Sequence, residues 1–342
     1  MNNDNISSIG KEGLIKRIVG KFSIKHPSTV VGIGDDAAVL DYRHKPFAVA
    51  TSFFSEGIHF NLTYTPLKHL GYKISTVSFS NIFAMNALPR QILVSLAVSS
   101  KYKLSMIDEL YEGISRACVR YGVDLVGGEI TSSYTGLNIS ITAIGELLYE
   151  TPVLRNGAKI NDLICVSGNV GAAYVGLQIL QREAEVFNAT GEQPDLENYS
   201  YVVERQLKPE ARGDIIELLH KLSIIPTSMI DISKGLAIEI IKICESSNKG
   251  CNVYLDKIPI DPETKKVSEE LNIDSLIPAL HGGEDYELLF TIPLASYELI
   301  KDMPQISIIG HIIEKEKGMN FVTSNGSSIK FEDFEIKHNK KN

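Results

Sequence analysis

Four segments of the chain place acidic side chains next to glycine, and these residue types together can bind a metal ion and a phosphate. They are Gly32–Ala38, Gly127–Ser133, Ser228–Gly235 and His281–Glu287. Glycine lets the backbone approach a ligand closely, and carboxylate oxygens are ligands that magnesium prefers. Any one of these segments is also explained by a tight turn with exposed acids. Four in one chain favour a site for a polyanion and a divalent metal ion.

The first two segments would contribute in different ways. Asp35 and Asp36 are adjacent carboxylates between small residues, so they can bring oxygens to a cation; an exposed turn is the alternative. Gly127 and Gly128 end a short apolar run that predicts a strand, and their backbone N–H groups can face a phosphate. Glu129 follows directly and can hold the magnesium ion of that phosphate. The alternative is a tight turn from strand to loop.

The other two segments adjoin predicted strands. Asp231, Ser233 and Lys234 lie at a strand-to-helix junction, and a helix N-terminus favours an anion. The alternative for Asp231 or Ser233 is a helix N-cap. Glu284 belongs to a run of acids that leads into the apolar residues Leu288–Phe290, which places its carboxylate at the mouth of a strand.

Two isolated residues are candidates for the same site. His59 lies in a predicted loop, and Arg155 precedes Asn156 and Gly157 in a polar linker. For both, a solvated surface position is the alternative to a ligand role. The sequence has no phosphate loop of the GxxxxGK[ST] type, no dinucleotide-binding fingerprint, no kinase catalytic loop, no nucleophile elbow and no HExxH pair. The common nucleotide-binding and hydrolase solutions are therefore excluded.

Alternating strand and helix patterns must position these residues. In the first half, the sequence predicts strands over 30–40, 47–53, 91–99, 123–126 and 137–143, and helices over 66–86 and 104–121. The helix over 104–121 has eight apolar or aromatic residues on one face. A polar segment with proline and glycine follows, so we expect a domain boundary near residue 150.

The second half mixes strands and helices in the same way. The sequence predicts strands over 163–167, 228–231, 252–255, 286–292 and 306–312, helices over 172–181, 196–206, 209–222 and 235–246, and a loop over 184–198. We therefore expect an α/β or α+β protein with two mixed domains, 1–150 and 151–342.

The bulk composition excludes several classes of protein. With 342 residues, 44% hydrophobic and 22% charged, the chain is neither disordered nor fibrous. Its net charge of −8 gives no general attraction for nucleic acid or an anionic membrane. The four cysteines form no CxxC pair, and no apolar run reaches the roughly 18 residues of a membrane span. We therefore expect buried thiols, no signal peptide and a cytoplasmic location.

These segments, in this order, resemble the thiamine-monophosphate kinase family of the aminoimidazole-ribonucleotide synthetase-like superfamily. The matching positions, spread over nearly the whole chain, are Gly32–Ala38, Thr51–Ser52, Glu56–Phe60, Tyr72–Lys73, Ser78–Met85, Gly127–Thr131, Arg155–Ala158, Ile230–Gly235 and Gly282–Leu288. The resemblance implies ATP-dependent phosphorylation of thiamine monophosphate to thiamine diphosphate by direct phosphoryl transfer, with magnesium as cofactor. It also implies a homodimer whose N-terminal domains pair, with ATP and magnesium near that pairing.

The resemblance implies roles for individual residues as well. The implied metal ligands are Asp36, Thr51, Asn81, Glu129 and Asp231. The residues implied to contact the nucleotide are Gly128, Glu129, Arg155 and Ser233. The residues implied to contact the substrate are His59, Glu284 and Phe334. The residues implied to act in catalysis are Asp231 and Lys234.

Some positions depart from the family pattern. Ser52, Asn81 and Lys234 stand where the family has aspartates, so this part of the chain is four charge units more positive than the pattern. Lys234 can replace a metal ion, because an ammonium neutralises phosphate as a point charge. The alternatives are a catalytically degenerate paralogue that binds thiamine phosphate or nucleotide, and a related ATP-using enzyme of the same superfamily.

Overall fold

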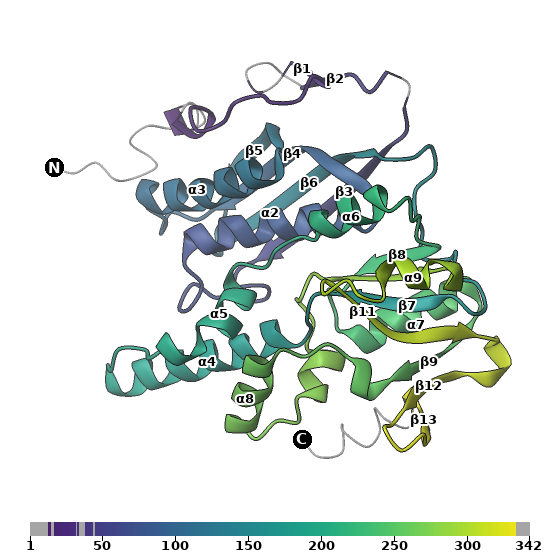
Figure 1. The fold of residues 1–342 in the computed structure, drawn as a ribbon. Helices are drawn as coiled ribbons and strands as arrows, with labels where there is room; N and C mark the ends of the chain where they lie inside the picture. The colour runs from purple at the N-terminus through teal and green to yellow at the C-terminus, as the bar shows by residue number, and fades with distance from the viewer. Residues whose placement is uncertain (1–12, 15–16, 32, 34–37, 44, 333–342) are drawn as a thin grey trace. The chain divides into compact units, whose positions relative to one another are not determined.

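The computed structural model describes residues 13–14, 17–31, 33, 38–43 and 45–332. The chain divides into two compact units (Figure 1). Unit 1 comprises Met1–Phe83 and Ala87–Pro152, and unit 2 comprises Ala84–Asn86 and Val153–Asn342. Each unit mixes helices and strands, which confirms the predicted fold class. The site predictions for Asp35, Asp36 and Phe334 lie outside the described residues.

Unit 1 is built on a four-stranded sheet in the order β3-β6-β4-β5. Its strands are β3 (Phe47–Ser55), β4 (Ala87–Val98), β5 (Asp124–Ser132) and β6 (Leu137–Leu147). The pair β4–β5 is parallel, and the other two pairs are antiparallel. The helices α2 (Leu67–Phe83) and α3 (Leu104–Tyr121) lie side by side over one face of this sheet (Figure 1).

The two helices of unit 1 are packed with their backbones in close contact. A Cβ atom at Gly71 would lie 2.0 Å from the carbonyl oxygen of Leu110, and one at Gly113 would lie 2.0 Å from that of Lys68. Glycine is therefore required where α2 and α3 touch. Seven of the eight residues on the predicted face of α3 are buried and Tyr121 is half-buried, and α2 contacts β3, β6 and β4. This packing holds α2 against the sheet.

Several strand predictions in unit 1 were wrong in extent, two of them in a way that bears on the site. Residues 30–40 do not form one strand: β1 (Thr29–Val31) and β2 (Val39–Leu40) pair antiparallel in a separate two-stranded sheet. The strand predicted over 123–126 is longer, because β5 continues through Gly127 and Gly128 to Ser132. The apolar run ends at the glycines, but the backbone pairing with β4 does not.

Unit 2 is built on a seven-stranded sheet in the order β13-β12-β9-β11-β7-β10-β8. Its strands are β7 (Leu163–Ser167), β8 (Ser228–Asp231), β9 (Gly250–Tyr254), β10 (Leu288–Ile292), β11 (Ile306–Ile313), β12 (Met319–Val322) and β13 (Ser328–Lys330). All neighbours are antiparallel except β9 and β12. Its helices are α4 (Ala172–Thr190), α5 (Ser200–Leu207), α6 (Gly213–Lys221), α7 (Leu236–Ser247), α8 (Pro262–Glu270) and α9 (Tyr297–Ile300).

The core of unit 2 lies between α7 and the sheet. Ile240 and Ile243 of α7 pack in one cluster with Val253 of β9 and Leu289 of β10. All four cysteines of the chain are buried and free. Among the described helices, none has the length and apolar character that crossing a membrane requires.

Several predictions for unit 2 were wrong at element ends, two of them for a clear physical reason. The loop predicted over 184–198 begins too early, because α4 continues to Thr190 and ends at Gly191, which has a left-handed φ of 76°. The last turns of α4 are exposed, so they show no apolar periodicity. The strand predicted from 286 begins at Leu288, since Glu284 and Tyr286 have left-handed φ angles of 59° and 52°.

Candidate functional site

In unit 1, Ser52 and Asn81 lie together between β3 and α2. The Asn81 Nδ2 group donates a hydrogen bond to Ser52 Oγ at 3.3 Å and another to the Val77 carbonyl oxygen at 3.4 Å. Both side chains are half-buried. Two of the positions at which the resemblance implies aspartates are therefore occupied by a neutral hydrogen-bonded pair.

Thr51 lies on the opposite face of the same strand. It is exposed, and its Oγ1 donates to the Ile141 carbonyl oxygen at 3.4 Å and accepts from Thr142 Oγ1 at 3.2 Å. Successive side chains of a strand point to opposite faces of the sheet. Thr51 and Asn81, both predicted as metal ligands, are thus on different faces and do not converge.

Gly128 and Glu129 lie on β5, at the edge of the same sheet. A Cβ atom at Gly128 would lie 1.9 Å from the carbonyl oxygen of Val94, its partner on β4, so only glycine fits there. Glu129 is exposed, and its Oε1 accepts from the Ile130 N–H at 3.1 Å. The contact that requires glycine at position 128 is therefore with the backbone of the neighbouring strand β4.

The registers of the four strands give the position of Glu129 relative to β3. Glu129 is level with Ser95 of β4, which is level with Ser140 of β6 and Phe53 of β3. With neighbouring strands about 4.8 Å apart, Glu129 lies at least about 14 Å from β3. Within one copy of unit 1, Glu129 and Thr51 therefore cannot bind the same ion.

His59 lies on an exposed turn that follows β3. Its Nδ1 accepts from the Ser55 N–H at 3.1 Å. The turn is held by Glu56, which accepts from Lys101 Nζ at 2.7 Å and Tyr102 OH at 2.6 Å. Burial opposes ionisation of Glu56, but the hydrogen bonds from these groups outweigh it and lower the pKa of that carboxyl group. These hydrogen bonds fix the turn that carries the exposed His59 imidazole.

In unit 2, the predicted strand-to-helix junction at Asp231 is confirmed. Asp231 ends β8 and is only 5% exposed, and α7 begins at Leu236. The intervening Ser233 does not cap the helix: its Oγ donates to Glu239 Oε1 at 3.4 Å, and the Lys234 N–H donates to the same oxygen at 3.2 Å. The Lys234 side chain is exposed to solvent.

The segment Glu284–Glu287 lies against this junction. The Glu284 N–H donates to the Ser233 carbonyl oxygen at 2.9 Å, and the Tyr286 N–H donates to that of Ile232 at 2.9 Å. The Ile232 N–H donates back to the Glu287 carbonyl oxygen at 2.7 Å. The fold therefore brings together the backbones that carry Asp231, Ser233, Lys234 and Glu284, four of the predicted site residues.

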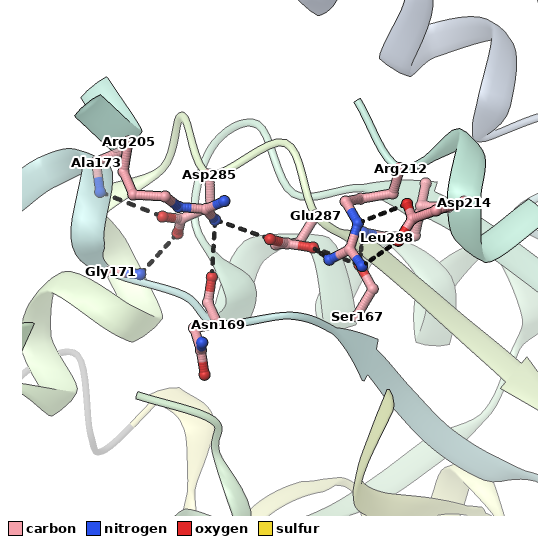
Figure 2. Close-up of polar contacts among 10 residues, drawn as sticks. All are labelled: Ser167, Asn169, Gly171, Ala173, Arg205, Arg212, Asp214, Asp285, Glu287 and Leu288. Atoms are coloured by element: carbon pink, nitrogen blue, oxygen red, sulfur yellow. Dashed lines mark hydrogen bonds and ion pairs between the residues drawn. The ribbon is translucent and has the colours of Figure 1, made fainter. Parts of the chain in front are cut away.

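A buried ionic network supports this segment (Figure 2), and sequence reasoning missed it. Glu287, 1% exposed, accepts from Ser167 Oγ at 2.6 Å and from Arg205 Nη2 at 2.8 Å, and it also pairs with Arg212. Arg212 in turn holds Asp214 through two hydrogen bonds of 2.9 and 2.8 Å. The His281–Glu287 segment carries a sequence motif, but Arg205 within α5 and Arg212 just before α6 belong to no motif.

Asp285 of the same segment binds the N-terminus of α4. Its Oδ2 accepts from the Gly171 N–H at 2.8 Å and its Oδ1 from the Ala173 N–H at 3.4 Å (Figure 2). Burial raises the pKa of Asp285 to about 7, although the Gly171 hydrogen bond and the charge of Arg205 both oppose that rise. Asp285 is thus a buried anchor with an unusually basic carboxylate.

Arg155 is exposed in the loop before β7. Its carbonyl oxygen accepts from Ser247 Oγ at 3.1 Å, at the C-terminal end of α7. Ser233 and Lys234 precede the N-terminal end of the same helix. The backbone of Arg155 is therefore anchored at the other end of α7 from the junction.

The described residues do not form a magnesium site by themselves. Within 13–14, 17–31, 33, 38–43 and 45–332, no group of three or more histidine, cysteine, aspartate or glutamate side chains is placed to hold a metal ion. The Ser52–Asn81 pair supplies only neutral atoms, and a protonated lysine at position 234 cannot be a ligand. These three positions therefore offer neutral polar atoms and a positive charge in place of a cluster of carboxylates.

Comparisons with known proteins agree with this fold. Residues 34–147 match the family described as AIR synthase related protein, N-terminal domain. A thiamine-monophosphate kinase of Bacillus subtilis (strain 168) is 33% identical over 314 residues, which is 90% of this chain and 93% of the relative. The chain therefore belongs to the thiamine-monophosphate kinase family.

Solved structures are similar over almost the whole chain. The structure of AaThiL complexed with AMPPCP and TMP has a TM-score of 0.74 and 29% identity, and the match covers 94% of this chain and 96% of that one. Thiamine-monophosphate kinase from Stenotrophomonas maltophilia K279a has a TM-score of 0.78 and 27% identity, covering 92% of this chain and 96% of that one. The similarity spans both units.

Proposed function

We propose that this chain transfers the γ-phosphoryl group of ATP to the phosphate of thiamine monophosphate, forming thiamine diphosphate and ADP. The observation that carries the proposal is the match along 94% of the chain to a structure complexed with AMPPCP, an ATP analogue, and TMP. Direct phosphoryl transfer needs positioning and charge neutralisation rather than a covalent enzyme intermediate. A preformed junction with an exposed cation suits that requirement.

Lys234 is the residue that we assign to the transferred phosphate. Its side chain is exposed, three residues after Asp231 in the sequence, while its backbone N–H donates to the fully buried Glu239. A lysine ammonium neutralises phosphate oxygens as a point charge. We assign the Ser233 hydroxyl to the nucleotide phosphates and Asp231 to the cation that accompanies ATP, so Asp231 and Lys234 are the proposed catalytic pair.

The remaining assignments are also proposals. Gly128, Glu129 and Arg155 would contact the nucleotide, and His59, Glu284 and Phe334 would contact thiamine monophosphate. Magnesium enters as the counter-ion of ATP. The residues assigned to magnesium are Asp36, Thr51, Asn81, Glu129 and Asp231. Because Thr51 and Glu129 cannot bind the same ion within one copy of unit 1, this assignment requires more than one magnesium ion.

We propose a homodimer that forms through the uncovered face of the unit 1 sheet. Phe47, Val49 and Phe53 alternate along β3 on the face away from α2, and they are 52%, 57% and 60% exposed. A row of exposed apolar residues on a sheet is typical of an interface. Sedimentation velocity should give the dimer mass for the native chain and a smaller species for Phe53→Asp.

We also propose a cytoplasmic location, because the four free thiols suit a reducing compartment.

The test is chromatographic detection of thiamine diphosphate from thiamine monophosphate, ATP and magnesium, with thiamine as the acceptor control. Product that disappears in Lys234→Met supports the proposal. Binding of ATP or thiamine monophosphate by calorimetry without any product would instead establish the degenerate paralogue. Transfer to a different acceptor would establish another ATP-using enzyme of the superfamily.

A further inference from the structure

Two consecutive residues of α5 each hold one acid of the Glu284–Glu287 segment. Gln206 Nε2 donates to Glu284 Oε2 at 3.0 Å, and Arg205 Nη2 donates to Glu287 Oε1 at 2.8 Å. The partners lie 78 and 82 positions away in sequence. A single turn of helix therefore sets both ends of the segment that borders the proposed site.

These contacts are made at a cost to stability. Arg205 Nε and Gln206 Oε1 are buried, and neither has a hydrogen-bond partner among the described residues. A buried polar atom left without a partner costs about 1–3 kcal/mol. A helix end selected only for stability would not combine two such atoms with a buried guanidinium, whereas local rules are commonly broken where a functional geometry must be held.

The Glu284–Glu287 segment is hydrogen-bonded to the Asp231–Lys234 junction, so the contacts from α5 also help to hold the junction. Its backbone exchanges hydrogen bonds with Ile232 and Ser233, and two of its four residues, Glu284 and Tyr286, have left-handed φ angles. Residues other than glycine hold such angles only when their surroundings fix them. Gln206 and Arg205 are the side chains that fix this segment from α5.

We propose that Gln206 and Arg205 are positioning residues that hold Glu284 and its backbone against the Asp231–Lys234 junction, and that Gln206 sets the orientation of the Glu284 carboxylate toward the phosphorylated substrate. The proposal rests on the proposed function, in which Glu284 contacts thiamine monophosphate. It adds two residues of α5 that do not themselves touch the reacting groups.

The experiment compares Gln206→Met and Gln206→Glu with the native chain. Methionine keeps the length without a donor, and glutamate keeps the shape but repels Glu284. Both variants should raise the KM for thiamine monophosphate and its calorimetric Kd about tenfold, which corresponds to about 1.4 kcal/mol. The kcat and the KM for ATP should change less than threefold.

Arg182→Met is the matched control. It removes an ion pair with Glu183 at 2.8 Å and a cation–π contact with Tyr199 in the same unit, away from the Glu284–Glu287 segment. It should leave both KM values unchanged. A merely structural role for Gln206 would lower the melting temperature and the active fraction, which reduces kcat and leaves KM as it is.

The outcomes separate the two proposals. If the native chain forms thiamine diphosphate and both Gln206 variants keep its KM and Kd, the positioning role is refuted. If the native chain binds thiamine monophosphate without forming product, the proposed function fails, and the Kd of the variants still decides the positioning role. If it neither binds nor reacts, both proposals are overturned.

Discussion

The hydrogen bond between Asn81 and Ser52 allows a direct test of whether β3 and α2 frame a metal position. In the double variant Ser52→Asp/Asn81→Asp, two carboxylates replace groups that lie 3.3 Å apart. At about 4 Å and an effective dielectric constant near 20, two like charges repel by about 4 kcal/mol. Because both side chains are half-buried, solvent reduces that value, and we expect a loss of about 2–4 kcal/mol in the absence of divalent ions.

A divalent cation should reverse this loss. An ion bound with a Kd near 0.1 mM stabilises the variant by about 2.7 kcal/mol at 10 mM. For a unit of this size, that is a rise of roughly 5–11 °C in melting temperature. Scanning calorimetry with and without magnesium measures it, and sodium chloride of equal ionic strength controls for screening.

The same preparations connect stability to turnover. The degenerate-paralogue alternative predicts that adding Lys234→Asp raises the rate of thiamine diphosphate formation by orders of magnitude over the native chain, whereas the catalytic role proposed for Lys234 predicts no such rise. If the melting temperature of the double variant is the same with and without magnesium, the inference that Ser52 and Asn81 occupy a metal position is refuted. A magnesium-dependent melting temperature with an unchanged rate in the triple variant would show that the native site is already tuned without these acids.

Three further variants test individual contacts in the two units. Glu287→Gln leaves two arginines without their buried partner and should cost about 3–5 kcal/mol in urea unfolding, whereas Glu298→Gln, in an exposed pair, should cost under about 1 kcal/mol. Gly128→Ala should destabilise unit 1 by about 1–3 kcal/mol in thermal unfolding, because its Cβ would lie 1.9 Å from the carbonyl oxygen of Val94. In the control Gly127→Ala, the nearest atom to the added Cβ is Leu93 Cδ2 at 3.4 Å, so this variant should be tolerated. Equal melting temperatures of the two variants would contradict this prediction. Burial raises the pKa of Asp285 from 3.8 to about 7, so between these values the folded chain keeps a proton that the unfolded chain releases. The free energy of unfolding should therefore fall by up to about 4 kcal/mol as the pH rises from about 4 to 7. In urea titrations at a series of pH values, Asp285→Asn should lack this decrease.

Regular elements with one buried face were predictable from local pattern. The stripe of α3 and the alternation of β6 appear in the sequence because each element buries one face and exposes the other. The junction at Asp231 was also predictable, since a fully buried strand runs into a helix there. In these places, residue type and burial change together.

The failures have different physical causes. The end of α4 is exposed to solvent, so its residues carry no periodic signal, and β5 continues through glycines because its pairing with β4 depends on backbone groups. The support of Glu287 could not be predicted, because Arg205 within α5 and Arg212 just before α6 lie 82 and 75 positions from Glu287 in the sequence. Charge partners at such separations have no local signature.

The surroundings of Lys234 are consistent with a cation at this position. Glu239, fully buried, accepts the Ser233 hydroxyl and the Lys234 N–H on one oxygen and pairs with Lys242 at 2.7 Å through the other. An aspartate at 234 would add a negative charge to a residue whose backbone contacts this buried carboxylate, whereas a lysine adds a positive one. The neutral Ser52–Asn81 pair likewise satisfies its own hydrogen bond. A retuned phosphate site requires neighbours that accept the substituted residues, as these hydrogen bonds do, and formation of thiamine diphosphate by the native chain is the measurement that distinguishes a retuned site from a lost one.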